Sequence, residues 1–180
     1  MIPAAKYAHD ALLYEPVSGR LIWKHRPEYH FEKAVSSRTW NTKNPGSEVF
    51  IDRNKTGHGR FTMNKTRHSE SRVMFLLMEG RWPEHQIDHI NGDPTDNRWS
   101  NLREVTAAEN SQNLAMSSAN TSGRMGVSFN KRRGKWQASI KVNGRGVALY
   151  WGTSFNDAVA AREAAEVKYG YHENHGRSCY

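Results

Sequence analysis

The sequence predicts an α+β fold made of three small units. Residues 1–68 carry short strand and turn signals, which indicate a small β-rich N-terminal region. Residues 69–116 show a helix pattern and then a strand, a turn-rich loop, a second strand and a second helix. After a linker at 117–123, residues 124–176 predict a C-terminal three-stranded antiparallel sheet packed on one helix.

The formal net charge of +8 is unevenly distributed over the 180 residues. Basic residues exceed acidic ones by five in 1–84 and by six in 121–180, whereas acidic residues exceed basic ones by three in 85–120. An acidic centre between basic flanks suits a polyanion held on both sides of a cation-binding site. A merely basic protein is the plain alternative.

The chain has no apolar run of about 18 residues and no signal-peptide pattern at its start. We therefore expect an intracellular, cytoplasmic protein without membrane contact, in the host cytoplasm if a phage encodes it. The only cysteine, Cys179, excludes an intrachain disulfide and a cysteine-based zinc site.

In the N-terminal region, apolar residues at 12–14 and 21–23 flank turn-forming residues and predict a β-hairpin. A polar stretch with weak patterning follows, up to about Asn44, and predicts no regular element. Further strands are predicted at Glu48–Asp52 and Gly59–Met63.

The central unit begins with a helix predicted from Ser69, a possible N-cap, to Gly80, a typical C-terminal residue. Thr106 and Glu109 have the spacing of a capping box, which predicts the start of a second helix running to about Met116. Between the helices, strands are predicted at Gln86–Ile90 and Leu102–Val105.

The C-terminal unit shows period-two alternation in two segments, 135–142 and 146–151, followed by an alanine-rich helical run from about Asn156. One set of alternating side chains is predicted to form the core: Trp136, Ala138, Ile140, Leu149 and Trp151.

Four polar residues of the central unit are candidates for a catalytic site. Asp88 and His89 end a predicted strand, Asn101 opens the next strand, and Asn110 lies in the first turns of the capped helix. A hairpin followed by a helix can bring the four positions around one point. They offer a carboxylate oxygen, an amide oxygen and an imidazole able to take a proton from water.

This segment has two other interpretations. A calcium loop starting at Asp88 would need Glu at its twelfth position, where the chain has Trp99. A turn-rich loop whose polar residues only cap the backbone is the second alternative. We expect Asp93, Asp96 and Asn97 to do only that.

The pattern Asp88-His89, Asn101-Leu-Arg and Val105-Thr to Asn110 resembles the HNH homing endonucleases common in bacteriophages. The resemblance covers roughly 69–113 and implies the ββα-metal HNH nuclease core. It implies that Asp88 and Asn110 bind one divalent cation, Mg²⁺ or Mn²⁺, that His89 activates the attacking water, and that Asn101 steadies the loop carrying the histidine.

This chain departs from the phage enzymes at one place. They usually have a His-Arg pair at the start of the helix before the motif, where this chain has Ser71-Arg72. We expect Arg72 to contact DNA phosphate or to have a structural role, and not to act as a catalyst. His85 is treated as a bystander.

The C-terminal unit resembles the APETALA/ethylene-response-factor DNA-binding domain of plants through Gly126-Val127, Gly134-Lys-Trp136 and Gly152-Thr to Phe155. The resemblance implies that one face of the sheet contacts duplex DNA and that the helix covers the other face. The residues expected to face DNA are Arg132, Arg133, Lys135, Gln137, Lys141, Arg145 and Tyr150.

The sequence thus predicts a metal-dependent, homing-type DNA endonuclease that hydrolyses phosphodiester bonds and binds double-stranded DNA. A non-catalytic DNA-binding regulator derived from a nuclease and a binder of structured RNA are the alternatives.

Overall fold

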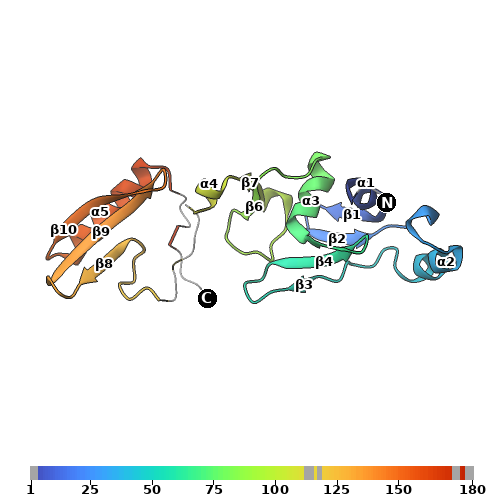
Figure 1. Cartoon of the computed structure of the whole chain (residues 1–180), viewed down its shortest axis with the longest axis horizontal. Helices are drawn as coiled ribbons and strands as arrows, with labels where there is room; N and C mark the ends of the chain where they lie inside the picture. The colour runs from blue at the N-terminus through green and yellow to red at the C-terminus, as the bar shows by residue number, and fades with distance from the viewer. Residues whose placement is uncertain (1–3, 112–115, 117–118, 172–174, 177–180) are drawn as a thin grey trace. The chain divides into compact units, whose positions relative to one another are not determined.

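The structure is a computed structural model, and it describes all residues except 1–3, 112–115, 117–118, 172–174 and 177–180. The fold is mixed α+β with small sheets, as predicted (Figure 1). Its contacts divide the chain into two compact units, residues 1–105 and 106–180. Among the described residues, no helix has the length and apolar character needed to cross a membrane.

The first unit opens with a helix and a hairpin. Helix α1 (Ala4–Ala11) is followed by strands β1 (Leu12–Glu15) and β2 (Arg20–Trp23), which pair antiparallel with Leu13 opposite Ile22. The predicted hairpin is therefore confirmed. The helix before it was not predicted, although three of its residues, Tyr7, Ala8 and Ala11, are buried.

The polar stretch after the hairpin is helical, contrary to the prediction. It contains a 3₁₀ turn, η1 (Glu28–His30), and helix α2 (Ala34–Lys43). Only Ser37 of α2 is buried, so the helix shows no apolar stripe that periodicity could detect. Trp40 of α2 packs edge-on against Trp23, with ring centroids 5.3 Å apart, and lies 4.5 Å from the Arg26 guanidinium.

A three-stranded sheet and a helix follow in the first unit. Strands β3 (Asp52–Arg53), β4 (Gly59–Met63) and β5 (Thr66–Ser69) pair in that order. The predicted strand at 48–52 is wrong, because only an isolated bridge from Glu48 and the short β3 form there. Helix α3 (Glu70–Glu79) follows directly and ends at Gly80, whose φ of 72° is left-handed.

The last two strands of the first unit pack on its hydrophobic core. Strands β6 (Gln86–His89) and β7 (Leu102–Val105) pair antiparallel, with a 3₁₀ turn, η2 (Trp99–Asn101), before β7. Trp99 contacts Phe75 of α3, with ring centroids 5.8 Å apart. The buried core extends from α1 to β7 and includes Tyr7, Leu12, Leu21, Phe61, Met63, Val73, Met74, Leu76 and Leu102.

The second unit begins with helix α4 (Ala107–Ser111). The predicted capping box is confirmed, since Thr106 N donates to Glu109 Oε2 at 2.8 Å and Glu109 N donates to Thr106 Oγ1 at 3.3 Å. The predicted continuation of this helix lies partly outside the described residues, at 112–115.

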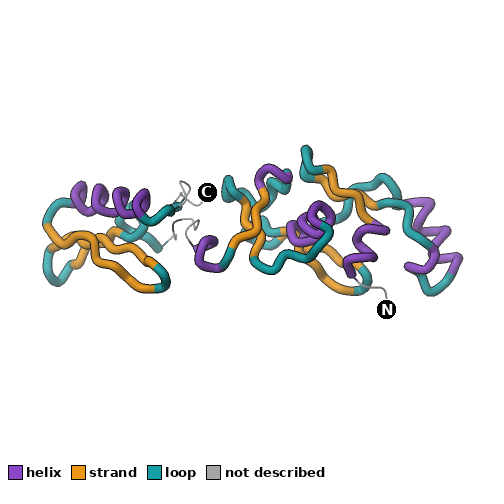
Figure 2. Tube along the Cα trace, turned by 90° about the horizontal axis from the view of Figure 1, so that it is seen from above, coloured by secondary structure: helices purple, strands orange, loops and turns teal. Residues whose placement is uncertain are grey.

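Three strands and a helix follow. Strands β8 (Val127–Asn130), β9 (Lys135–Val142) and β10 (Arg145–Gly152) form an antiparallel sheet with β9 in the middle. Helix α5 (Phe155–Lys168) runs along one face of this sheet (Figure 2). Val127, Ala138 and Ala158 form the buried centre between them.

A β-bulge in β10 reverses the predicted orientation of two aromatic side chains. Ala148 lies opposite Ser139 and Tyr150 lies opposite Ala138, so one extra residue shifts the alternation. Tyr150 therefore packs against the core beneath α5, and its hydroxyl accepts a hydrogen bond from Ser154 N at 3.2 Å. Trp151 lies on the opposite, open face and is 42% exposed. The predictions that Tyr150 lies on the open face and Trp151 in the core are wrong.

This reversal predicts unequal costs for two aromatic truncations. Tyr150→Ala should lower the free energy of unfolding by roughly 2–4 kcal/mol, since it empties part of a packed core. Trp151→Ala should cost less than about 1 kcal/mol, because its ring is exposed. Urea unfolding followed by circular dichroism measures both variants. A larger loss for Trp151→Ala would contradict the bulge.

Candidate functional site

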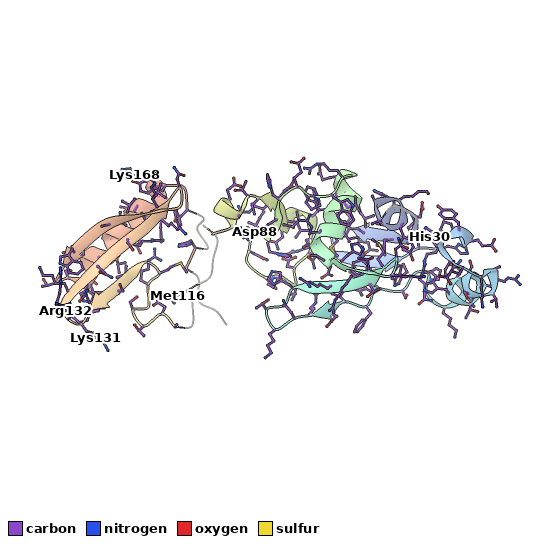
Figure 3. The ribbon with its side chains drawn as sticks, viewed as in Figure 1. His30, Asp88, Met116, Lys131, Arg132 and Lys168 are labelled. Carbon is purple, nitrogen blue, oxygen red and sulfur yellow. The ribbon has the colours of Figure 1, made fainter. Side chains whose placement is uncertain are left out.

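The β6–β7 hairpin positions the predicted acidic residue. Asp88 lies opposite Arg103, and its Oδ2 accepts hydrogen bonds from Arg103 Nε at 2.9 Å and from Nη2 at 2.7 Å. The Asp88 side chain is 10% exposed, on the hairpin shown in Figure 3. The two hydrogen bonds from one guanidinium fix the orientation of this carboxylate.

His89 ends β6 and is buried. Its Nε2 lies 3.0 Å from Oδ1 of Asn97, which can only accept a hydrogen bond. The Nε2 atom must therefore carry the proton, and the neutral ring has its lone pair on Nδ1. Asn97 was predicted only to cap a turn, and this prediction is wrong because its side chain fixes the tautomer of His89.

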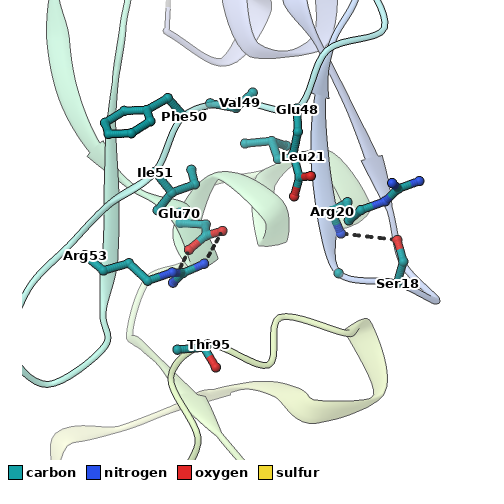
Figure 4. Close-up of a pocket in the computed structure, with 11 residues that line it drawn as sticks. Ser18, Arg20, Leu21, Glu48, Val49, Phe50, Ile51, Arg53, Glu70 and Thr95 are labelled. Atoms are coloured by element: carbon teal, nitrogen blue, oxygen red, sulfur yellow. Dashed lines mark hydrogen bonds and ion pairs between the residues drawn. The ribbon is translucent and has the colours of Figure 1, made fainter.

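Asn97 is itself held by groups from outside the loop. Tyr14 Oη donates to Asn97 O at 2.6 Å, and the Asn97 side chain hydrogen-bonds to the carboxylate of Glu70. Glu70 is buried at the start of α3 and pairs with Arg53 at 2.9 and 3.3 Å (Figure 4). Burial raises the pKa of the Glu70 carboxyl, while Arg53 and Asn97 act in the opposite direction.

The Arg53–Glu70 pair lines a cavity of about 460 Å³, to which Thr95 also contributes (Figure 4). A continuous chain of polar contacts thus links Arg53, Glu70, Asn97 and His89, and we call it the Glu70 relay. Sequence reasoning missed Glu70, because an acidic residue in the first turn of a helix is expected for the helix dipole alone.

Asn101 organises the loop between the two strands. Its Nδ2 donates to Asn91 Oδ1 at 3.0 Å and to Asp96 O at 2.7 Å, and its Oδ1 accepts from Asn91 N at 2.9 Å. Asn101 is buried, so these bonds are formed away from water. Asp96 adds a contact with Arg98, whose hydrogen bonds lower the pKa of the Asp96 carboxyl to about 2.

The structure brings Asp88, His89 and Asn101 together on one hairpin and its loop. Asn110 lies on α4 in the second unit, half-buried, with its N donating to Thr106 O at 2.9 Å. No group of three or more His, Cys, Asp or Glu is clustered for a metal within the described part of the chain. The Asp88 carboxylate is an oxygen donor, the kind of ligand that Mg²⁺ and Mn²⁺ prefer.

Arg72 has a structural contact. Its Nη1 donates to His85 O at 2.6 Å and its Nη2 to Pro83 O at 2.8 Å, which ties α3 to the segment leading into β6. Of its two predicted roles, the structural one is thus observed, and contact with DNA stays a prediction.

The residues predicted to face DNA occupy three places in the second unit. Lys135, Gln137 and Lys141 alternate along β9 on the open face, where Gln137 lies opposite Ser128 and Trp151. Arg132 and Arg133 lie in the turn before β9, where Figure 3 labels Arg132. Arg145, opposite Val142 at the other turn, is exposed but has the register of the helix-covered face.

Comparison with known proteins gives a match over the segment that carries the four predicted catalytic and metal-binding residues. Residues 71–112 match the family model of HNH endonucleases. This HNH segment contains Asp88, His89, Asn101 and Asn110. The rest of the chain, including Arg53, Glu70 and the C-terminal sheet, lies outside it.

Two viral proteins are similar to the chain. Protein 3.8 of Escherichia phage T7 is 38% identical over 61 residues, which cover 34% of this chain and 50% of that protein. An uncharacterized HNH endonuclease, L247, of Acanthamoeba polyphaga mimivirus is 34% identical over 101 residues, 51% of this chain and 25% of that protein. The chain therefore matches half or less of the length of these relatives. No solved structure matches.

The Asp96–Arg98 contact makes the stability of the loop sensitive to acid. A carboxyl whose pKa is lowered stabilises the folded state above its ordinary value of 3.8, and this contribution is lost as the pH falls toward about 2. Asp96→Asn lacks it at every pH. The gap in melting temperature between wild type and Asp96→Asn should therefore close between about pH 4 and pH 2. A gap that stays constant over this range in calorimetry would contradict the assignment.

Proposed function

We propose that the protein is a metal-dependent DNA endonuclease of the HNH, homing-type class. The observation that carries the proposal is the coincidence of the HNH segment with a hairpin that presents a paired carboxylate and an oriented, buried imidazole. One of its viral relatives, an HNH endonuclease by name, supports the same class.

In this mechanism His89 is the general base. Its Nε2–H is engaged by Asn97, so Nδ1 takes a proton from the water that attacks the scissile phosphate. Asn101 keeps the loop after His89 in place through three hydrogen bonds. Asp88 and Asn110 would hold a divalent cation, Mg²⁺ or Mn²⁺, whose positive charge stabilises the charge that develops on the phosphate.

The C-terminal sheet is proposed to bind duplex DNA through its open face and the adjoining turn. Seven basic residues and no acidic ones lie between 121 and 155, and the helix α5 covers the opposite face. Lys135, Lys141, Arg132 and Arg133 are suited to phosphate contacts, which supply most of the salt-dependent affinity. Arg145 lies at the other end of β9, in the turn that leads into β10.

Supercoiled plasmid DNA with Mg²⁺ tests the nuclease proposal, because nicked and linear products separate on a gel. Wild type should convert the plasmid, and His89→Ala should bind it normally but cut at least roughly 10²–10⁴-fold more slowly. His85→Ala, at an exposed histidine near the same strand, is the matched control and should cut normally. Binding without cleavage by wild type would favour the alternative of a non-catalytic regulator. Preference for structured RNA would favour the other alternative.

Removing divalent cations with a chelator tests whether cleavage depends on a metal ion. Cleavage should stop in EDTA and return with Mg²⁺ or Mn²⁺, because the proposed ligands are oxygen atoms. Asp88→Asn should need a higher concentration of metal for the same rate, since it removes the ligand charge. Full activity in chelator would exclude this site.

Charge replacement tests the DNA-binding surface. Changing Arg132, Arg133 and Lys141 together to Ala should weaken binding and reduce its log–log salt slope by about 0.9 for each lost phosphate contact. The matched single pair is Lys141→Ala on the open face and Lys168→Ala on α5, where only the first should change the slope. An unchanged slope in the triple variant would place the DNA contact elsewhere in the chain.

A further inference from the structure

A second histidine lies beside His89, and it comes from outside the HNH segment. His58 follows β3 and precedes β4, and its ring centroid is 6.3 Å from that of His89, with the two planes at 79°. His58 is exposed whereas His89 is buried. The two imidazoles therefore meet edge to face at the surface of the candidate site.

The short loop before His58 holds the imidazole in one orientation. Asn54 Oδ1 accepts hydrogen bonds from Thr56 N at 3.0 Å, from Thr56 Oγ1 at 2.8 Å and from His58 N at 3.0 Å. The Thr56 hydroxyl also lies 3.0 Å from His58 Nδ1. Because its single hydrogen is donated to Asn54, the hydroxyl must accept from Nδ1–H. The lone pair of neutral His58 is therefore on Nε2.

The loop is also fitted against the site. Gly57 has a φ of +87°, and a side chain there would lie 2.7 Å from the Pro94 side chain in the loop that follows β6. On the other side of His58, Gly59 is buried against the Glu70 carboxylate, where a larger residue would collide. Two close approaches thus fix the position of His58 next to the Glu70 relay.

We propose that His58 is a further catalytic residue, whose Nε2 accepts a hydrogen bond from the attacking water and orients it beside His89. This role rests on the proposed nuclease function. Although the His58 residue as a whole is exposed, partial desolvation of its ring and the neighbouring His89 lower the pKa of His58, which favours the neutral ring that this role needs. A neutral imidazole with its lone pair on Nε2 accepts from water but has no proton there to give to a phosphate oxygen.

The step balances as an ordinary hydrolysis. One hydrogen of the water passes to His89 Nδ1 as the new P–O bond forms. The other hydrogen stays on the attacking oxygen, hydrogen-bonded to His58 Nε2, and becomes part of the product phosphate. The P–O ester bond breaks with its electron pair on the leaving sugar oxygen, which takes a proton from solvent.

Single-turnover cleavage of plasmid DNA by a set of position-58 variants tests the proposal. His58→Ala should lower the cleavage rate by about 10–100-fold with unchanged DNA affinity, an effect in the range of losing one oriented polar group. His58→Gln, which offers an acceptor oxygen, should retain most of the rate. His58→Lys, which has donors only, should be no better than the alanine variant. His85→Ala is the control and should behave as wild type.

The outcomes separate this proposal from the nuclease function itself. If wild type cuts, His89→Ala does not, and His58→Ala cuts at the wild-type rate, only the role of His58 is overturned. A rate for His58→Lys above that of His58→Gln would also overturn it, because a cation would then be contacting phosphate. No cleavage by wild type with any divalent cation would overturn both. Because His58 is exposed, melting curves of the three variants should match wild type; if His58→Ala melts early, the Gln–Lys comparison decides.

Discussion

The hydrogen bond between His89 Nε2 and Asn97 Oδ1 is the contact on which the candidate site depends. A buried imidazole without a fixed partner could turn or change tautomer, and a general base must present its lone pair in one direction. Asn97 removes that freedom. Tyr14, Glu70 and Arg53 in turn remove the freedom of Asn97. Each of these partners is contributed by an element outside the β6–β7 hairpin.

This arrangement explains why the segment matched to the HNH family is packed so closely with the region before it. Asp88 and His89 lie within residues 71–112. The residues that hold Asn97 in place beside the histidine belong to β1, β3 and the first position of α3. The common core from α1 to β7 fixes these elements in one unit. A buried polar network of this kind is stabilising only when every donor and acceptor in it is hydrogen-bonded. The N-terminal region, which supplies several of these groups, therefore helps to orient the residues of the candidate site.

Local signals were sufficient to predict much of the fold and to identify the polar residues of the β6–β7 hairpin as candidates for the site. Turn formers between apolar runs predicted the β1–β2 hairpin, and the capping box predicted the start of α4. The tertiary contacts were out of reach. Asn97 has the sequence context of a turn residue, and only the folded loop shows that it faces His89. Likewise, an extra residue in β10 cannot be read from alternation, so Tyr150 and Trp151 were exchanged.

The tautomer of His89 tests this account most directly. In the folded protein labelled with ¹⁵N at histidine, long-range ¹⁵N–¹H correlation spectra distinguish a protonated ring nitrogen from one that carries a lone pair. At a pH where the ring is neutral, we expect Nε2 of His89 to be protonated and Nδ1 to carry the lone pair. Asn97→Ala should allow both tautomers. A neutral His89 with its proton on Nδ1 would contradict the claim that Asn97 orients the proposed base.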